Sequence, residues 1–389
     1  MSLKTKVVQS TKKDGYEAGQ EVASKLLKEL GERPDFLILN CNIGYEMQDL
    51  LDGIKEKMGD IPMSGSTWEG VIGQNFVDES LHSVQLVGMR SDSVKFHNFC
   101  IKGTAESSEL LGEELGNEFS KIKYTGNKLL FLTPDFRLNV TTLFKGIDKN
   151  FKVDIVGGLA GDNFSFQKCY QFNNWEILTH SAPAILMVGD FKYKTLITHG
   201  SEPIGEPEKI TKTHLNQILE IGNQPALDVL SKHFGETITP KNQANAVLCA
   251  PIAKKLEGKF KALSPYIMSA VLGMDFEKKF IFTPVLYQEG EIIQFMRRSP
   301  KGIIDSNKSA AEMLRKEIGN EKILFAAQYD CGGRGKSMFA NDTLEIATIF
   351  QKILGKEIPW FGTFTFGEIS PLEGTNYFHN YTGTVVVIY

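Results

Sequence analysis

The chain has 389 residues, of which 42% are hydrophobic and 23% are charged, and its formal net charge is -4. This composition is typical of a globular protein that is large enough for two domains. The weak negative charge gives no reason to expect nucleic-acid binding. Since no apolar stretch approaches the roughly 20 residues of a membrane-spanning helix and no signal peptide begins the chain, we expect a cytoplasmic protein without membrane insertion.

The five cysteines are scattered singly along the chain, without a CxxC pair. This pattern favours a reducing compartment over a disulfide framework or a zinc site. The histidines also lack the helical two-ligand spacing of a metal site. We therefore expect no metal and no protein-specific cofactor, apart from the haem alternative given below.

The first part of the chain predicts a helical lead-in over residues 1–35. Its apolar residues fall on one helical face between residues 15 and 31, and Gly31 is a plausible C-cap. A buried-type strand follows over 36–40, then an amphipathic helix over 47–58, then a glycine-rich strand over 61–67. The order is strand, helix, glycine-rich strand.

The same order returns over residues 129–162 and again over 323–369. Three copies indicate an α/β fold of pseudo-repeated units with mixed sheets, forming two lobes. One arrangement of such units is a layered α-β-β-α sandwich. In the third copy, Asp342 and Glu345 predict a capping box at the start of a helix that Gly355 ends.

Alternating stretches between the copies predict three antiparallel hairpins. The expected strand pairs are 81–90 with 94–101, 184–189 with 193–198, and 280–288 with 291–297. A polar run with prolines over 203–224 interrupts the apolar pattern, and Pro225 opens a new helical segment. We therefore expect one domain over residues 36–222 and another over 223–389.

Three ordered motifs near the end of the chain carry a resemblance to a known family. They are CGGRG at 331–335, GTFTFGEI at 362–369 and HNYT at 379–382. Together they resemble the C-terminal half of the FIST sensory domain, and residues 157–162 and 200–205 resemble its N-terminal half. Ser66 and Thr67 keep a Ser-Thr pair of that half, but no Glu follows Gly70, so we expect a different specificity at that loop.

The resemblance implies a FIST N-like domain over 36–222 and a FIST C-like domain over 223–389. It also implies a sensory protein that binds a small ligand such as an amino acid and signals through a separate protein. A haem-dependent nitric oxide sensor is an alternative that the family suggests, with no histidine assigned as ligand. An uncharacterised enzyme and an interaction scaffold stay open as well. We assign no catalytic residue, since no GxSxG, Walker or HExxH motif is present.

The candidate ligand-binding residues lie where glycine-rich strands end. Arg334 between glycines suits a carboxylate or phosphate, and Asp162 suits an ammonium group, although a salt bridge and a turn cap are the structural alternatives. Glu368 and His379 would form an acid-base pair or tie down a loop. Cys331 is either a reactive thiol or a small buried residue. The full set is Ser66, Thr67, Asp162, Cys331, Arg334, Thr363, Thr365, Glu368, His379 and Asn380.

Overall fold

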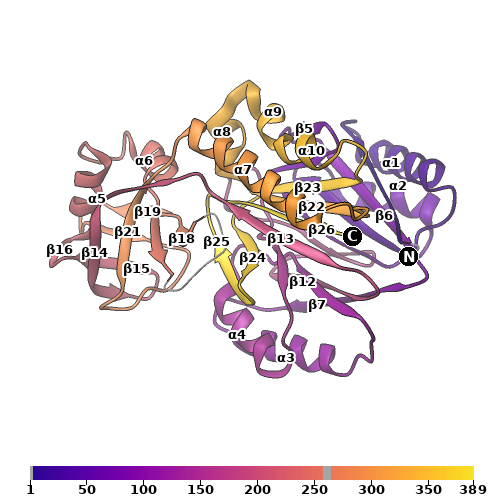
Figure 1. Cartoon of the computed structure of the whole chain (residues 1–389), viewed down its shortest axis with the longest axis horizontal. Helices are drawn as coiled ribbons and strands as arrows, with labels where there is room; N and C mark the ends of the chain where they lie inside the picture. The colour runs from indigo at the N-terminus through magenta and orange to yellow at the C-terminus, as the bar shows by residue number, and fades with distance from the viewer. Residues whose placement is uncertain (1–2, 257–263) are drawn as a thin grey trace. The chain divides into compact units, whose positions relative to one another are not determined.

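The computed structural model describes residues 3–256 and 264–389 as a mixed α/β protein (Figure 1). The chain divides into two compact units. Unit 1 contains the residues up to Leu196 together with Ala311–Phe378 and Gly383–Tyr389, and unit 2 contains Ile197–Ala310 and His379–Thr382. The domain boundary expected at residues 222–223 falls inside unit 2, in the turn between two of its strands, so the halves expected from the sequence are not the compact units.

Unit 1 is built from three six-stranded sheets, and each contains one parallel strand pair. The pairs are β2 (Phe36–Asn42) with β3 (Met63–Trp68), β8 (Asn127–Leu132) with β9 (Ile155–Gly158), and β22 (Phe325–Cys331) with β23 (Trp360–Thr365). Helices connect the two strands of every pair. The three predicted copies of strand, helix and strand are confirmed.

The first two copies pack their helices through glycines. The pairs are α1 (Gly15–Leu30) with α2 (Met47–Met58), and α3 (Ser108–Ser120) with α4 (Val140–Asn150). A Cβ at Gly53 would lie 2.2 Å from the Tyr16 carbonyl oxygen, and one at Gly146 would lie 2.1 Å from that of Glu109. Only glycine permits this close backbone approach. The predicted C-cap of α1 is confirmed, since Gly31 is left-handed with φ 76°.

The third copy connects its strands less regularly. Its connection contains α8 (Lys336–Phe339), α9 (Thr343–Ala347) and α10 (Ile349–Leu354), and α7 (Pro300–Ile318) precedes β22. The predicted capping box is wrong, because the Asp342 side chain makes no cap hydrogen bond. Asp342 has φ -88° and ψ 3°, whereas an N-cap residue needs an extended backbone.

All three predicted hairpins are wrong, because the two strands of each join different partners. β6 (Val84–Ser91) pairs with β2 and with β1 (Leu3–Ser10), a strand that the sequence did not predict. β7 (Val94–Lys102) pairs instead with β12 (Ser181–Gly189). β13 (Tyr193–Thr198) lies beside β26 (Gly383–Ile388). In unit 2, β20 (Phe280–Phe282) and β21 (Ile292–Arg297) are likewise not paired with each other.

The sheets of unit 1 also exchange hairpins in a cycle. β4 (Gly70–Gly73) and β5 (Phe76–Asp78) follow β3 in the chain but extend the sheet of β23. β10 (Gln171–Asn173) and β11 (Glu176–Leu178) follow β9 but extend the sheet of β3. β24 (Glu368–Leu372) and β25 (Thr375–His379) follow β23 but extend the sheet of β9. Each copy therefore gives a hairpin to one neighbour and receives one from the other.

The inner faces of the three sheets share one hydrophobic core. Phe36, Phe131 and Phe361, one from each sheet, belong to a single cluster of buried residues. Burial of such aromatic side chains supplies much of the driving force for folding. The core of unit 1 thus lies among three sheets, where the sequence had left a sandwich of two as one arrangement.

Unit 2 has one mixed-length antiparallel sheet and its own core. The strand order is β18 (Tyr266–Ser269), β17 (Ile252–Lys255), β21, β14 (Glu202–His214), β15 (Gln217–Ile221), β20 and β19 (Gly273–Asp275), with β16 (Gln224–Pro225) beside β15. The helices are α5 (Ala226–Phe234), which Pro225 precedes as predicted, and α6 (Gln243–Cys249). Throughout the described chain, no helix combines the length and apolarity that crossing a membrane requires.

Candidate functional site

The three hairpin exchanges bring three chain crossovers together in unit 1. We call residues 67–70, 158–162 and 364–368 the crossover site; each segment leaves the carboxyl end of a parallel strand. Three backbone hydrogen bonds join the segments in a ring: Gly161 N to Thr67 O at 2.8 Å, Glu69 N to Phe364 O at 3.1 Å, and Leu159 N to Gly367 O at 2.9 Å. Carboxyl ends of parallel strands are where α/β proteins commonly bind ligands.

Each crossover contributes one buried carboxyl group. Glu69 and Asp162 are 2% exposed and Glu368 is fully buried. A buried carboxylate is costly unless hydrogen bonds or opposite charges compensate it. The partners of the three carboxyls therefore decide what the site does.

Asp162 organises the loop that follows it. Its carboxylate accepts hydrogen bonds from the Ser165 hydroxyl and from three backbone N–H groups, those of Phe166, Gln167 and Lys168, at 2.6 to 2.9 Å. Burial raises the pKa of Asp162, but these donors outweigh it and hold the pKa below its ordinary value. Its oxygens are engaged as a turn cap, the structural alternative weighed for this residue.

Glu368 is bonded within its own crossover, where the Thr365 hydroxyl donates to Glu368 Oε1 at 2.8 Å. Ser66 and Thr67 are likewise engaged: Ser66 Oγ lies 3.1 Å from Thr133 Oγ1, and Thr67 Oγ1 donates to the Gly161 carbonyl at 2.8 Å. These side chains fix the crossovers to one another.

Glu69 differs from the other two acids because one of its oxygens is not engaged. Oε1 accepts from the Asp162 N–H at 2.7 Å, whereas Oε2 is buried without a hydrogen-bond partner among the described residues. Burial raises the pKa of Glu69 to about 8, and the nearby Asp162 charge adds to this. The N–H groups of Asn163 and Phe164 lower the pKa in part, without reaching hydrogen-bond geometry.

Backbone and one phenyl ring enclose Glu69. A Cβ at Gly161 would lie 2.3 Å from Glu69 Oε1, so only glycine leaves room for the carboxyl there. A Cβ at Gly332 would lie 3.3 Å from Glu69 Cγ and 2.8 Å from Phe164 Cζ. The Phe164 ring and the Glu69 side chain therefore meet over the start of the predicted Arg334 loop.

Four phenylalanines form what we call the aromatic patch beside this carboxyl: Phe136, Phe164, Phe166 and Phe366. Phe166 and Phe366 stack with centroids 4.4 Å apart, yet Phe164 is 44% and Phe166 57% exposed. Asn163, Phe164 and Phe166 all have positive φ, from 52° to 59°. Non-glycine residues rarely adopt this backbone, and such strain concentrates at functional sites.

Arg334 lies in the short 3₁₀ turn Gly332–Arg334 and is 2% exposed. Its Nε is 2.8 Å from Asp330 Oδ1, so the salt bridge weighed as its structural alternative is present. Asp330 Oδ2 also accepts from Gln328 Nε2 at 3.1 Å, and Gln328 Oε1 accepts from the Trp360 indole at 2.9 Å. A buried polar network thus holds the arginine.

A further carboxyl that the sequence analysis missed lies beside the arginine loop. Both oxygens of Glu79 accept from the Lys336 N–H, at 2.9 and 3.1 Å, and a Cβ at Gly335 would lie 2.4 Å from Glu79 Oε2. Burial raises the pKa of Glu79 to about 7. The site is therefore rich in acidic groups.

The remaining candidates are placed as follows. Cys331 and Thr363 are buried in β22 and β23 of unit 1. His379 and Asn380 belong to unit 2, where Asn380 Oδ1 accepts from the Ala270 N–H at 3.1 Å. The proposed pairing of Glu368 with His379 spans the two units and stays a prediction.

Glu69 and the aromatic patch are the features that sequence reasoning missed. Glu69 entered the analysis only as a departure from a family motif, although it follows a Ser-Thr pair at a strand end. Its equivalence to Glu368 became visible once the hairpin exchange was known. Among the residues the structure describes, no three His, Cys, Asp or Glu side chains are grouped so as to hold a metal ion.

Comparison with known proteins gives two family matches that cover nearly the whole chain. The family model of the FIST N domain matches residues 35–224, and that of the FIST C domain matches residues 226–371. The curated relatives carry no described activity. An uncharacterised protein of Mycobacterium tuberculosis, MT0656, is 24% identical over 97% of both chains.

Two other relatives match over shorter regions. The uncharacterised protein Mb0898c of Mycobacterium bovis is 25% identical over 60% of each chain. The uncharacterised protein MJ1623 of Methanocaldococcus jannaschii is 22% identical over 59% of this chain and 46% of its own. The matched region thus spans about 60% of the length of the Mycobacterium bovis relative.

Proposed function

Since the chain belongs to the FIST family of signal-transduction sensory domains, we propose that it senses a small metabolite that carries an amine, such as an amino acid, at the crossover site. The observation that carries this proposal is Glu69, a buried carboxyl with one oxygen unbonded among the described residues. An ammonium group bound there would supply the missing donor and the missing positive charge.

The charge balance of the site supports a cationic group on the ligand. Asp162 and Asp330 are compensated by their hydrogen bonds and by Arg334. Glu69 and Glu79 carry raised pKa values because burial leaves them short of compensation. An ammonium at Glu69 would lower its pKa and favour the carboxylate.

The aromatic patch supports the same ligand chemistry. The negative face of a phenyl ring attracts an ammonium group, most strongly where water is excluded. Phe164 meets the Glu69 side chain over Gly332, so a ring and a carboxyl can share one cation. The exposed Phe166 ring offers an apolar surface for the rest of the ligand.

We further propose that ligand binding is passed to a separate signalling protein and that the protein acts in the cytoplasm. The five cysteines support a reducing compartment, because all are free thiols in the structure. The loop over 163–168 is the segment through which binding would be transmitted. It is anchored on Asp162 and carries two rings of the patch.

A thermal-shift screen of the purified chain against the twenty common amino acids and methylamine tests the proposal. A ligand that binds only the native state raises the melting temperature. We expect at least one amine to do so in the wild type and in the exposed-site control Glu114→Gln, and not in Glu69→Gln. An equal shift in Glu69→Gln, or no shift with any amine, would contradict the proposal.

The haem and enzyme alternatives stay predictions. An absorption spectrum before and after addition of haem tests the first, because a Soret band lost on replacement of one histidine would indicate gas sensing. The second requires Cys331, Glu368 and His379 to act together, and substrate turnover abolished by each single replacement would support it.

A further inference from the structure

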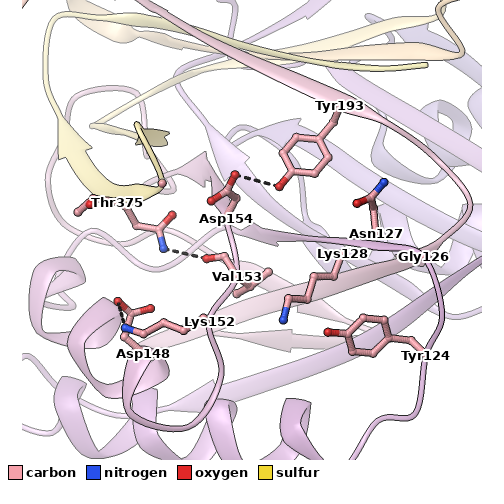
Figure 2. A pocket seen from close by; sticks show the side chains of 12 residues that line it. Tyr124, Gly126, Asn127, Lys128, Asp148, Lys152, Val153, Asp154, Tyr193 and Thr375 are labelled. Atoms are coloured by element: carbon pink, nitrogen blue, oxygen red, sulfur yellow. Dashed lines mark hydrogen bonds and ion pairs between the residues drawn. The ribbon is translucent and has the colours of Figure 1, made fainter. Parts of the chain in front are cut away.

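A pocket of about 490 Å³ lies in unit 1 at the opposite end of the β8–β9 pair from the crossover site (Figure 2). Its walls come from the residues before and at the start of β8, from the segment between α4 and β9, from Tyr193 on β13 and from the β24–β25 turn. A cavity of this volume suits a small organic molecule.

Hydrogen bonds hold the far walls of the pocket in place. The Asn376 side chain donates to the Val153 carbonyl at 2.9 Å and accepts from the Ile155 N–H at 2.8 Å, which joins the β24–β25 turn to the start of β9. The Tyr193 hydroxyl donates to Asp154 Oδ2 at 2.9 Å, as Figure 2 shows. The walls are therefore fixed by polar contacts that involve no ligand.

The charged side chains of the pocket leave one cation without a counter-ion. Asp154 accepts the Tyr193 hydroxyl, and Asp148 pairs with Lys152 at 3.0 Å. Lys128, by contrast, forms no ion pair with any carboxylate of the described chain. Its Nζ instead lies 4.2 Å from the centroid of the Phe151 ring and 5.5 Å from that of Tyr124.

The two rings hold the Lys128 ammonium at the pocket without neutralising its charge. A cation over an aromatic face at a partly exposed site gains only about 0.5–1 kcal/mol. Figure 2 shows Lys128 extending from β8 into the pocket beside the Tyr124 ring. Burial raises the pKa of Tyr193, with Asp154 adding to the effect, so this phenol stays a neutral wall.

We infer that this pocket is a second ligand site, which binds a small organic anion through Lys128 while the body of the ligand lies against Tyr124. A carboxylate and a phosphate both meet the requirement, because the lysine ammonium acts as a point charge. This site is independent of Glu69 and opposite to it in charge preference. A sensor with both sites reads two chemically different small molecules.

Ligand-observed fluorine NMR of 4-fluorobenzoate with the full chain tests the inference. We expect the fluorine line to broaden with wild-type protein and to sharpen again when unlabelled benzoate is added. Lys128→Met keeps the stem over the rings but removes the charge, and we expect it to weaken binding at least about tenfold. Lys145→Met, on α4 outside the pocket, is the matched control and should bind as the wild type does.

Two further arms keep the test decisive. Inorganic phosphate that displaces 4-fluorobenzoate only when Lys128 is present would support a site that accepts either anion, and failure to displace would restrict it to carboxylates. Thr375→Phe, at the exposed first residue of β25, narrows the cavity without touching the lysine and should also weaken binding. Unchanged binding in Lys128→Met, or no broadening with wild-type protein at millimolar 4-fluorobenzoate, would overturn the inference.

Discussion

The two ends of the β8–β9 pair differ in how they treat charge. At the crossover site, carboxyls are buried and mostly compensated by backbone donors or by Arg334, and Glu69 stands out as the one under-compensated acid. At the opposite end, the walls are open to solvent and Lys128 carries an uncompensated positive charge. Burial makes the first end the more costly to disturb, and exposure makes the second the more tolerant.

The largest expected effect is the loss of the buried arginine. Arg334→Met leaves Asp330 buried without its charge partner, which costs about 3–5 kcal/mol of unfolding free energy. Lys128→Met, its counterpart at the pocket end, should cost less than about 1 kcal/mol, since it removes one partly exposed cation-aromatic contact. Urea denaturation of both variants measures the contrast, and equal losses would contradict it.

The glycines of the two ends should differ next. Gly157 has φ 150°, and a Cβ there would lie 1.9 Å from the Leu132 carbonyl oxygen, so Gly157→Ala combines strain with a backbone clash. We expect it to cost about 3 kcal/mol. Gly374 has φ 77° with open space around it, so Gly374→Ala should cost about 1 kcal/mol. Chemical denaturation at one temperature compares the two, and a larger loss at Gly374 would be the contrary result.

Glu69→Gln should change how stability depends on pH. The folded protein holds the Glu69 proton up to a pKa of about 8, whereas the unfolded chain releases it near the ordinary value. Wild-type stability therefore falls as pH rises through this range, and the variant lacks this loss. We expect the variant to be about 2 kcal/mol more stable than wild type at pH 8.5 and about equal at pH 4.5. Thermal melts across pH check the sign, and a variant less stable at pH 8.5 would refute it.

The smallest stability effect is expected in the aromatic patch. Phe166 is 57% exposed, so Phe166→Ala should change the unfolding free energy by less than about 1 kcal/mol. If the patch holds the ligand, the same variant should weaken amine binding several-fold, because it removes a ring that stacks on Phe366. Parallel melting and titration separate the two effects, and a large stability loss with unchanged binding would mark the patch as structural.

Local sequence signals predicted the repeated units but not their exchange. The apolar periodicity of residues 36–67, 129–162 and 323–369 depends on near neighbours, so strand, helix and strand were predicted correctly. The segment after β6 has the alternation of a hairpin partner, yet it pairs with β12 instead. A short turn permits either outcome, and contacts distant in sequence decide between them.

The candidate site was predicted in part for the same reason. Strand ends rich in glycine identified Asp162 and Arg334, and the Asp330–Arg334 spacing of four residues was already present in the sequence. Glu69 was not predicted, because its importance depends on Asp162 and Gly332, far along the chain. A pocket such as that of Lys128 likewise depends on four segments that only the fold brings together.

The most direct test of the central claim is a calorimetric titration of the amine that most raises the melting temperature, carried out on wild type, Glu69→Gln and Lys128→Met. The account predicts one site, binding lost in Glu69→Gln and unchanged in Lys128→Met, and affinity that rises with pH up to about 8 as Glu69 ionises. Binding that survives Glu69→Gln, or that is lost only in Lys128→Met, would contradict the assignment of the crossover site.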